Sequence, residues 1–148
     1  MYTEYSDVFY SFTVNYFAPF LITKRISEIM IRQEEGAIVN ITSMMSFSRQ
    51  PGGSCYNTSK AALNQFTLSI AQELAPFNVR VNAVACGSFQ ADMFEKLNEI
   101  VQKKLIKATA LKRLATTKEI TSTVMFLASE RSSYITGEII RVDGGAVL

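Results

Sequence analysis

The chain has 148 residues, about what one compact domain needs, so we expect a single domain over residues 1–148. Hydrophobic residues make up 48% of the sequence and charged residues 19%, which excludes a disordered or fibrous chain. No histidine is present, which excludes Ser-His-Asp hydrolases, Cys-His proteases and histidine-ligated metal sites, and we expect no metal. Cys55 and Cys86 are more typical of two small buried thiols in a reducing compartment than of a disulfide, although a disulfide stays open here.

The charge is nearly balanced, with a formal net charge of +2. The densest basic stretch alternates with apolar residues, as the solvated face of a helix does, so we expect no nucleic-acid partner. Its basic members are Lys103, Lys104, Lys107, Lys112 and Arg113.

An apolar run from Val8 to Ile22 resembles a signal peptide only in part. Glu4 and Asp7 stand where a signal peptide carries positive charge, and the run is interrupted by polar residues and by Pro19. It is also too short to span a bilayer. We interpret it as a buried helix of a cytoplasmic protein that has no membrane partner.

In chain order, the hydrophobic periodicity predicts alternating helices and strands. A long helix is expected over residues 6–32, with a kink near Asn15 because Pro19 removes one helical hydrogen bond and crowds the preceding turn. The remaining elements are strands over 37–42, 79–85 and 138–142, helices over 55–74, 93–108 and 117–129, and a loop over 46–54. This alternation predicts an α/β fold with a parallel sheet. Three strands are few for a sheet covered on both faces, so the architecture looks like part of something larger.

The candidate chemistry begins with Tyr56 and Lys60, which stand four residues apart on a predicted helix and therefore share one face. A tyrosine is a weak acid at neutral pH, but a nearby ammonium stabilises its phenolate, so the pair is a plausible proton donor. Alone, the pair is also compatible with an ordinary surface contact. Ser43 strengthens the interpretation, because it follows a strand, and active sites of open parallel sheets lie beyond the carboxyl ends of strands. The turn at Gly87 falls at the same edge.

Together these motifs resemble the short-chain dehydrogenase/reductase family, in family order and at family spacing over almost the whole chain. The segments that carry the resemblance are I-V-N-I-T-S at 38–43, Y-N-T-S-K-A-A at 56–62, N-V-R-V-N-A-V at 78–84, F-L-A-S at 126–129, I-T-G at 135–137 and V-D-G-G at 142–145. The resemblance implies a Rossmann-like parallel sheet with flanking helices and an NAD(P)(H) cofactor.

The resemblance also implies roles for individual residues. Tyr56 matches the family's general acid/base, and Lys60 matches the lysine that assists it and holds the nicotinamide ribose. Ser43 matches the hydroxyl that polarises the substrate carbonyl, and Asn15 matches the asparagine at the helix kink that leads a water chain to the lysine. Cofactor contacts are implied for Tyr56 and Lys60 and for the turn that carries Gly87 and Phe89.

The chain departs from the family pattern in its cofactor-binding part. Its seven glycines, at positions 36, 52, 53, 87, 137, 144 and 145, form neither a G-x-G-x-x-G fingerprint nor a P-loop. Family members begin with a strand and a glycine-rich turn that hold the cofactor diphosphate, whereas this chain is expected to begin inside a later helix and to hold about the last three strands. Cys86 replaces a usual proline and Ala91 a usual threonine. We therefore expect cofactor binding to be weakened or lost.

Two functions stay open at this point. The first is an NAD(P)-dependent oxidoreductase, similar to 3-oxoacyl reductases, that interconverts a small-molecule alcohol and a carbonyl compound. The second is an inactive truncated remnant that acts, if at all, through the helices that pair across a dimer interface in this family. A homo-oligomer is expected in either case, because missing strands would expose a sheet edge and apolar helix faces. Several apolar residues could line a substrate pocket or belong to the ordinary core. These are Met44, Met45, Phe47, Met93, Phe94 and Leu97.

Overall fold

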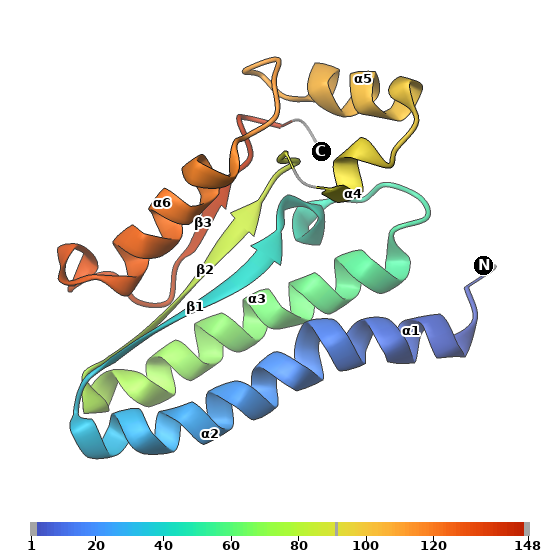
Figure 1. The fold of residues 1–148 in the computed structure, drawn as a ribbon. Coiled ribbons are helices and arrows are strands. Elements are labelled where there is room, and N and C mark those ends of the chain that lie inside the picture. The colour runs from blue at the N-terminus through green and yellow to red at the C-terminus, as the bar shows by residue number, and fades with distance from the viewer. Residues whose placement is uncertain (1–2, 91, 147–148) are drawn as a thin grey trace.

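The computed structural model describes residues 3–90 and 92–146. Its centre is a parallel sheet of three strands, β1 (Gly36–Ser43), β2 (Val79–Cys86) and β3 (Ile139–Val142), in the order β1-β2-β3. One face of the sheet is covered by α2 (Ala18–Gln33) and α3 (Ser54–Leu74), and the other by α6 (Thr117–Ala128) (Figure 1). The α/β class and the parallel sheet are therefore confirmed, and each predicted strand agrees with the observed one to within one residue at either end.

The first helical rod contains the irregularity expected near Asn15. It consists of α1 (Tyr5–Phe12), a π-helical turn η1 (Thr13–Phe17) and α2, which begins one residue before Pro19. Proline supplies no backbone N–H and its ring crowds the carbonyl one turn earlier. The wider π turn takes up this mismatch without ending the helix.

The expectation that this rod is buried was wrong. In the described part of α1 no residue is buried, and α2 buries only Thr23 and Ser27. The rod contacts α3 along one stripe, where the rings of Tyr16 and Phe20 lie 6.0 and 5.4 Å from the ring of Phe66. A sheet of three strands offers too little surface to cover the rest of the rod, so many of its large apolar side chains are exposed: Tyr5, Phe9, Tyr10, Val14, Phe17, Phe20, Leu21, Ile22, Ile26 and Ile29.

The core lies on the two faces of β2, whose residues are nearly all buried. On the α3 side, Val79 and Val81 pack with Ala71 and Leu74. On the α6 side, the cluster consists of Val84, Cys86, Ile120 and Leu127. A buried hydrogen bond of 2.9 Å from Asn40 Nδ2 to Thr67 Oγ1 also joins β1 to α3.

Two predicted segments differ in detail from the structure. The single helix expected over residues 93–108 is split into α4 (Asp92–Glu95) and α5 (Glu99–Ala108), because the Asn98 side chain accepts the Val101 N–H at 2.9 Å and starts a new helix. The loop expected over residues 46–54 begins inside a 3₁₀ turn, η2 (Met44–Phe47). Another short turn, η3 (Ala75–Phe77), follows α3, and η4 (Glu130–Ser132) follows α6.

The N-V-R-V-N motif has a structural task in this fold. The Arg80 guanidinium donates to the carbonyls of Leu127, Ser129 and Ile135 and to the Ser132 hydroxyl, at 2.9 to 3.4 Å. A cation at the carboxyl end of α6 is also favoured by the helix dipole. Arg80 therefore ties β2 to the end of α6.

Among the described helices, none has the length and apolar character needed to cross a membrane.

Candidate active site

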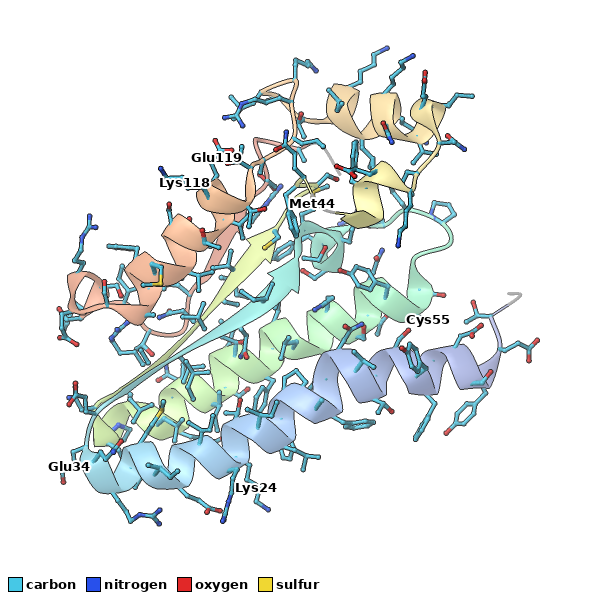
Figure 2. The ribbon with its side chains drawn as sticks, viewed as in Figure 1. Lys24, Glu34, Met44, Cys55, Lys118 and Glu119 are labelled. Atoms are coloured by element: carbon cyan, nitrogen blue, oxygen red, sulfur yellow. The ribbon has the colours of Figure 1, made fainter. Side chains whose placement is uncertain are left out.

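The candidate site lies at the carboxyl edge of the sheet. Ser43 and Cys86 are register partners at the last positions of β1 and β2, and Cys86 in turn pairs with Val142 at the end of β3. The beginning of α3 lies at the same end of the molecule, and α4 and α5 lie beyond the strand ends (Figure 1). Figure 2 labels two neighbours of the candidate residues. Met44 follows Ser43 at the end of β1, and Cys55 precedes Tyr56 at the beginning of α3.

Tyr56 and Lys60 lie one turn apart near the beginning of α3. Tyr56 is 43% exposed, so this residue lies at the surface of the site. The Lys60 ammonium donates to the Ile41 carbonyl at 3.0 Å, which connects α3 to the strand that carries Ser43. An ammonium has three N–H donors, so this bond leaves two for other partners.

Burial and a neighbouring thiol set the electrostatics of the site. Partial burial lowers the pKa of Lys60, and a smaller effect of Cys86 opposes that shift. Burial raises the pKa of the Cys86 thiol, and the Lys60 charge opposes it in turn. Cys86 is therefore a thiol in the electrostatic field of Lys60.

Ser43 is held in a position in which its hydroxyl proton can point outward. The side chain is only 7% exposed, and its Oγ accepts the Met45 N–H at 3.1 Å as the N-cap of η2. Because a hydroxyl has one donor and two acceptor positions, this bond leaves the proton for an external acceptor.

Asn15 is joined to the helix that carries Tyr56 and Lys60. Its Nδ2 donates to Ser59 Oγ at 3.1 Å, and that hydroxyl donates to the Tyr56 carbonyl at 2.8 Å. The π turn η1 therefore lies against α3 beside the candidate pair. Sequence reasoning missed Ser59, although its position between Tyr56 and Lys60 was a usable signal.

Gly87 and Phe89 form the turn that follows β2. A Cβ on Gly87 would lie 2.6 Å from the Asp143 Cα, so the chain's own packing requires glycine there, and the Gly87 N–H donates to the Val142 carbonyl. The Phe89 ring packs against the α6-side core. Its bridge with Ala115 uses the neighbouring Gln90 N–H and Ser88 carbonyl, so a ligand contact of Phe89 would involve its backbone.

Sequence reasoning also missed a pair of residues that support Ser43. Asn64 lies four residues after Lys60 on α3, and its Nδ2 donates to Ser46 Oγ at 2.7 Å. Ser46 Oγ donates to the Ser43 carbonyl at 2.6 Å. The signal was the continuation of the four-residue spacing from Tyr56 through Lys60.

The apolar residues expected near the site come from two segments. Met44 is buried in η2, whereas Phe47 is half-exposed and lies against the Arg141 guanidinium. Phe94 belongs to α4, and its carbonyl and that of Leu97 both accept the Gln102 amide. Ala91 and the Met93 side chain lie outside the described residues.

Both cysteines are free thiols, with Cys55 partly exposed and Cys86 buried. Within residues 3–90 and 92–146, no three carboxylate or thiol side chains gather closely enough to hold a metal ion.

Known proteins share both the sequence and the fold. A family model described as enoyl-(acyl carrier protein) reductase matches residues 2–147. A 3-oxoacyl-[acyl-carrier-protein] reductase of Aquifex aeolicus is 46% identical over 132 residues, which is 89% of this chain and 53% of the relative.

Two solved structures illustrate the range of these relatives. The crystal structure of acetoin dehydrogenase from Enterobacter cloacae is 37% identical, with a TM-score of 0.86 over 98% of this chain and 57% of that one. That of a putative gluconate dehydrogenase from Agrobacterium tumefaciens is 30% identical, with a TM-score of 0.94 over 99% of this chain and 60% of that one. The chain spans about half the length of the curated relatives it matches. From the match along residues 2–147 and the shared parallel sheet, we conclude that the chain belongs to the short-chain dehydrogenase/reductase family.

Proposed function

We propose that this chain carries the alcohol/carbonyl half of an NAD(P)-dependent oxidoreductase site. The observation that carries the proposal is the connection of α3 to β1 at one edge of the sheet, which brings Ser43, Tyr56 and Lys60 to that edge. Lys60 on α3 is bonded to β1 two residues before Ser43, and Tyr56 lies one turn before Lys60. Beyond the carboxyl ends of parallel strands is where α/β folds bind their ligands.

In the proposed reaction, each side chain has one role. The Tyr56 hydroxyl gives a proton to the carbonyl oxygen of the substrate, or takes one from the alcohol in the reverse direction. The Ser43 hydroxyl donates a hydrogen bond to the same oxygen and stabilises the charge that develops on it. The Lys60 ammonium stabilises the phenolate of Tyr56 after proton transfer, and Asn15 orients this part of α3 through Ser59.

The residues present fit one end of the cofactor. The nicotinamide group, when bound, supplies or accepts the hydride. Lys60 has two N–H donors beyond its bond to Ile41, and such donors suit the ribose hydroxyls of the nicotinamide half. The backbone of the Gly87–Phe89 turn lies at the same sheet edge. The sequence contains no glycine-rich turn for the diphosphate, so we propose that this chain alone binds the cofactor weakly.

For the substrate we propose a small carbonyl compound, with 3-oxoacyl thioesters as the first class to test. A 3-oxoacyl-[acyl-carrier-protein] reductase is 46% identical to this chain, and the acetoin dehydrogenase supports a second class of small hydroxy-ketones. Phe47, four residues after Ser43, is half-exposed and offers apolar surface that suits an acyl chain.

We also propose that the chain self-associates. An apolar groove of about 390 Å³ lies between α2 and α3 and includes Phe20, Phe66 and Ile70. It is continuous with the exposed apolar residues of α2, and exposed surfaces of this kind commonly mark interfaces.

The experiment combines cofactor binding with turnover. NADH and NADPH are titrated with the chain, and their fluorescence is measured. Oxidation of the cofactor is then followed with a 3-oxoacyl thioester as substrate and, separately, with the diketone whose reduction gives acetoin. Tyr56→Phe is expected to retain binding and the urea midpoint but to lose turnover, because only the hydroxyl is removed. Tyr134→Phe is the matched control, since Tyr134 is fully exposed outside the site.

Undiminished turnover in Tyr56→Phe would remove Tyr56 from the mechanism. If millimolar NADH and NADPH produce no fluorescence change with the wild-type chain, the alternative of an inactive remnant is favoured instead.

A further inference from the structure

The turn that follows β1 is tied to α3 by a short chain of hydrogen bonds. Asn64 Nδ2 donates to Ser46 Oγ at 2.7 Å, and Ser46 Oγ donates to the Ser43 carbonyl at 2.6 Å. Asn64 is 6% exposed and Ser43 is 7% exposed, so the two ends of this chain are shielded from water. Hydrogen bonds in such surroundings are poorly replaced by solvent, which makes the turn rigid.

The anchor of this chain lies on the same face of α3 as the proposed acid/base pair. Tyr56, Lys60 and Asn64 are spaced four residues apart on one continuous helix. Lys60 bonds to β1 at Ile41, and Asn64 bonds to the turn after β1 through Ser46. One hydrogen bond to α3 therefore precedes Ser43 in the sequence, at Ile41, and another follows it, at Ser46.

The donors of this chain of hydrogen bonds fix the position of the Ser43 hydroxyl. The Asn64 amide fills one acceptor position of Ser46, so the Ser46 proton goes to the Ser43 carbonyl. The resulting η2 turn presents the Met45 N–H to Ser43 Oγ, which accepts it at 3.1 Å. That bond uses one of the two acceptor positions of Ser43 Oγ and leaves its proton available for a substrate oxygen.

We propose that Ser46 and Asn64 are positioning residues that hold the Ser43 hydroxyl relative to Tyr56 and Lys60. The catalytic part of this inference rests on the proposed function, because it assumes that Ser43 donates to a substrate oxygen. Neither residue touches the reacting atoms in this proposal. Their effect is transmitted through the η2 turn, where a shift of one ångström can cost about 100-fold in rate.

Two variants interrupt the chain in different ways. Ser46→Ala removes the bridging hydroxyl. Asn64→Asp keeps the shape but replaces the donor by an acceptor, so the Ser46 proton turns toward the carboxylate and the Ser43 carbonyl loses its donor. Ser46→Thr keeps the hydroxyl and is the conservative rescue.

The matched control is Thr67→Val. It breaks the other buried tether between β1 and α3, from Asn40 to Thr67, which also joins an amide to a hydroxyl. That tether lies farther along α3 and does not reach η2, so Thr67→Val lowers stability while leaving the turn intact.

Two measurements are made on the full chain. Hydrogen exchange of the Met45 amide, followed by NMR, reports the turn without requiring turnover. We expect exchange about 10-fold faster in Ser46→Ala and Asn64→Asp, and wild-type exchange in Ser46→Thr and Thr67→Val. With substrate, kcat is expected to fall at least about 10-fold in the first two variants with KM within about twofold, because Ser43 acts in the transition state.

The outcomes separate this inference from the proposed function. Wild-type exchange of Met45 in both Ser46→Ala and Asn64→Asp overturns the tether, whatever the activity. Faster exchange with unchanged kcat overturns the positioning role. Faster exchange in a chain whose wild type neither binds cofactor nor turns over supports the tether, and the failure then belongs to the proposed function.

Discussion

The contact between Gly87 and Asp143 makes a quantitative prediction for Gly87→Ala. The added Cβ would lie 2.6 Å from the Asp143 Cα and 2.9 Å from its Cβ, whereas ordinary contacts begin at 3.4 Å. The chain after β2 and the chain after β3 must therefore separate by close to an ångström. This movement stretches the hydrogen bond of 2.9 Å from the Gly87 N–H to the Val142 carbonyl. Overpacking of this kind costs about 1–3 kcal/mol, so we expect a loss of about 2 kcal/mol.

The matched control is Gly36→Ala at the beginning of β1. Its Cβ would lie just as close to a neighbour, at 2.5 Å, but that neighbour is the Sδ atom of the flexible Met30 side chain. Rotation of the Met30 side chain relieves the contacts with its Sδ and Cγ, and only its Cβ, at 3.0 Å, must shift by a few tenths of an ångström. Replacing glycine by alanine also restricts the unfolded chain by about 0.4–1 kcal/mol, which offsets this cost. We therefore expect Gly36→Ala to be close to neutral.

Urea unfolding followed by circular dichroism measures both variants, with the free energy of unfolding obtained by linear extrapolation. The reasoning is refuted if the two variants lose equal stability, because the rigidity of the Asp143 backbone would then be irrelevant. It is also refuted if Gly87→Ala is as stable as the wild type.

Three further predictions concern the rest of the fold. Arg80→Ala is expected to lose about 3 kcal/mol in urea unfolding, since it leaves the carbonyls of Leu127 and Ser129 without this donor; wild-type stability would contradict this. Hydrogen bonds from Arg113 and Thr116 lower the pKa of Glu119 to about 2, so the stability it contributes is present above pH 4.5 and is lost as the pH falls toward 2. Glu119→Gln should therefore flatten acid unfolding between those values, and an unchanged acid profile would refute the link. In sedimentation velocity we expect the wild type to have a mass above that of the monomer and Phe20→Lys to have a mass closer to that of the monomer. Met125→Lys is the control, because Met125 is exposed on α6, away from the groove. A monomeric wild type would count against self-association.

The regular elements were predictable because their signals are local. The strand residues 37–42 and 79–85 and the helix 55–74 all agree with the structure to within one residue at each end. The spacing of Tyr56 and Lys60 placed both on one face of α3, and α-helical geometry alone ensures this.

The predictions differed from the structure where a single capping residue sets a helix boundary and where tertiary packing sets the burial of a helix face. The helix expected over 93–108 is interrupted because the Asn98 amide caps α5, and capping outweighs the continuing apolar pattern. The burial expected for residues 8–22 was wrong, because periodicity identifies an apolar face but does not say what covers it.

By itself, the sequence determined the alternating elements, the parallel sheet and the arrival of Ser43, Tyr56 and Lys60 at one sheet edge, because periodicity and chain connectivity leave few other arrangements. Only the tertiary structure decided that Lys60 bonds to Ile41, that Ser46 and Asn64 tie the turn after Ser43 to α3, and that Asp143 excludes a side chain at Gly87. These contacts join residues distant in the sequence, and their distances depend on how the helices pack against the sheet rather than on any local pattern.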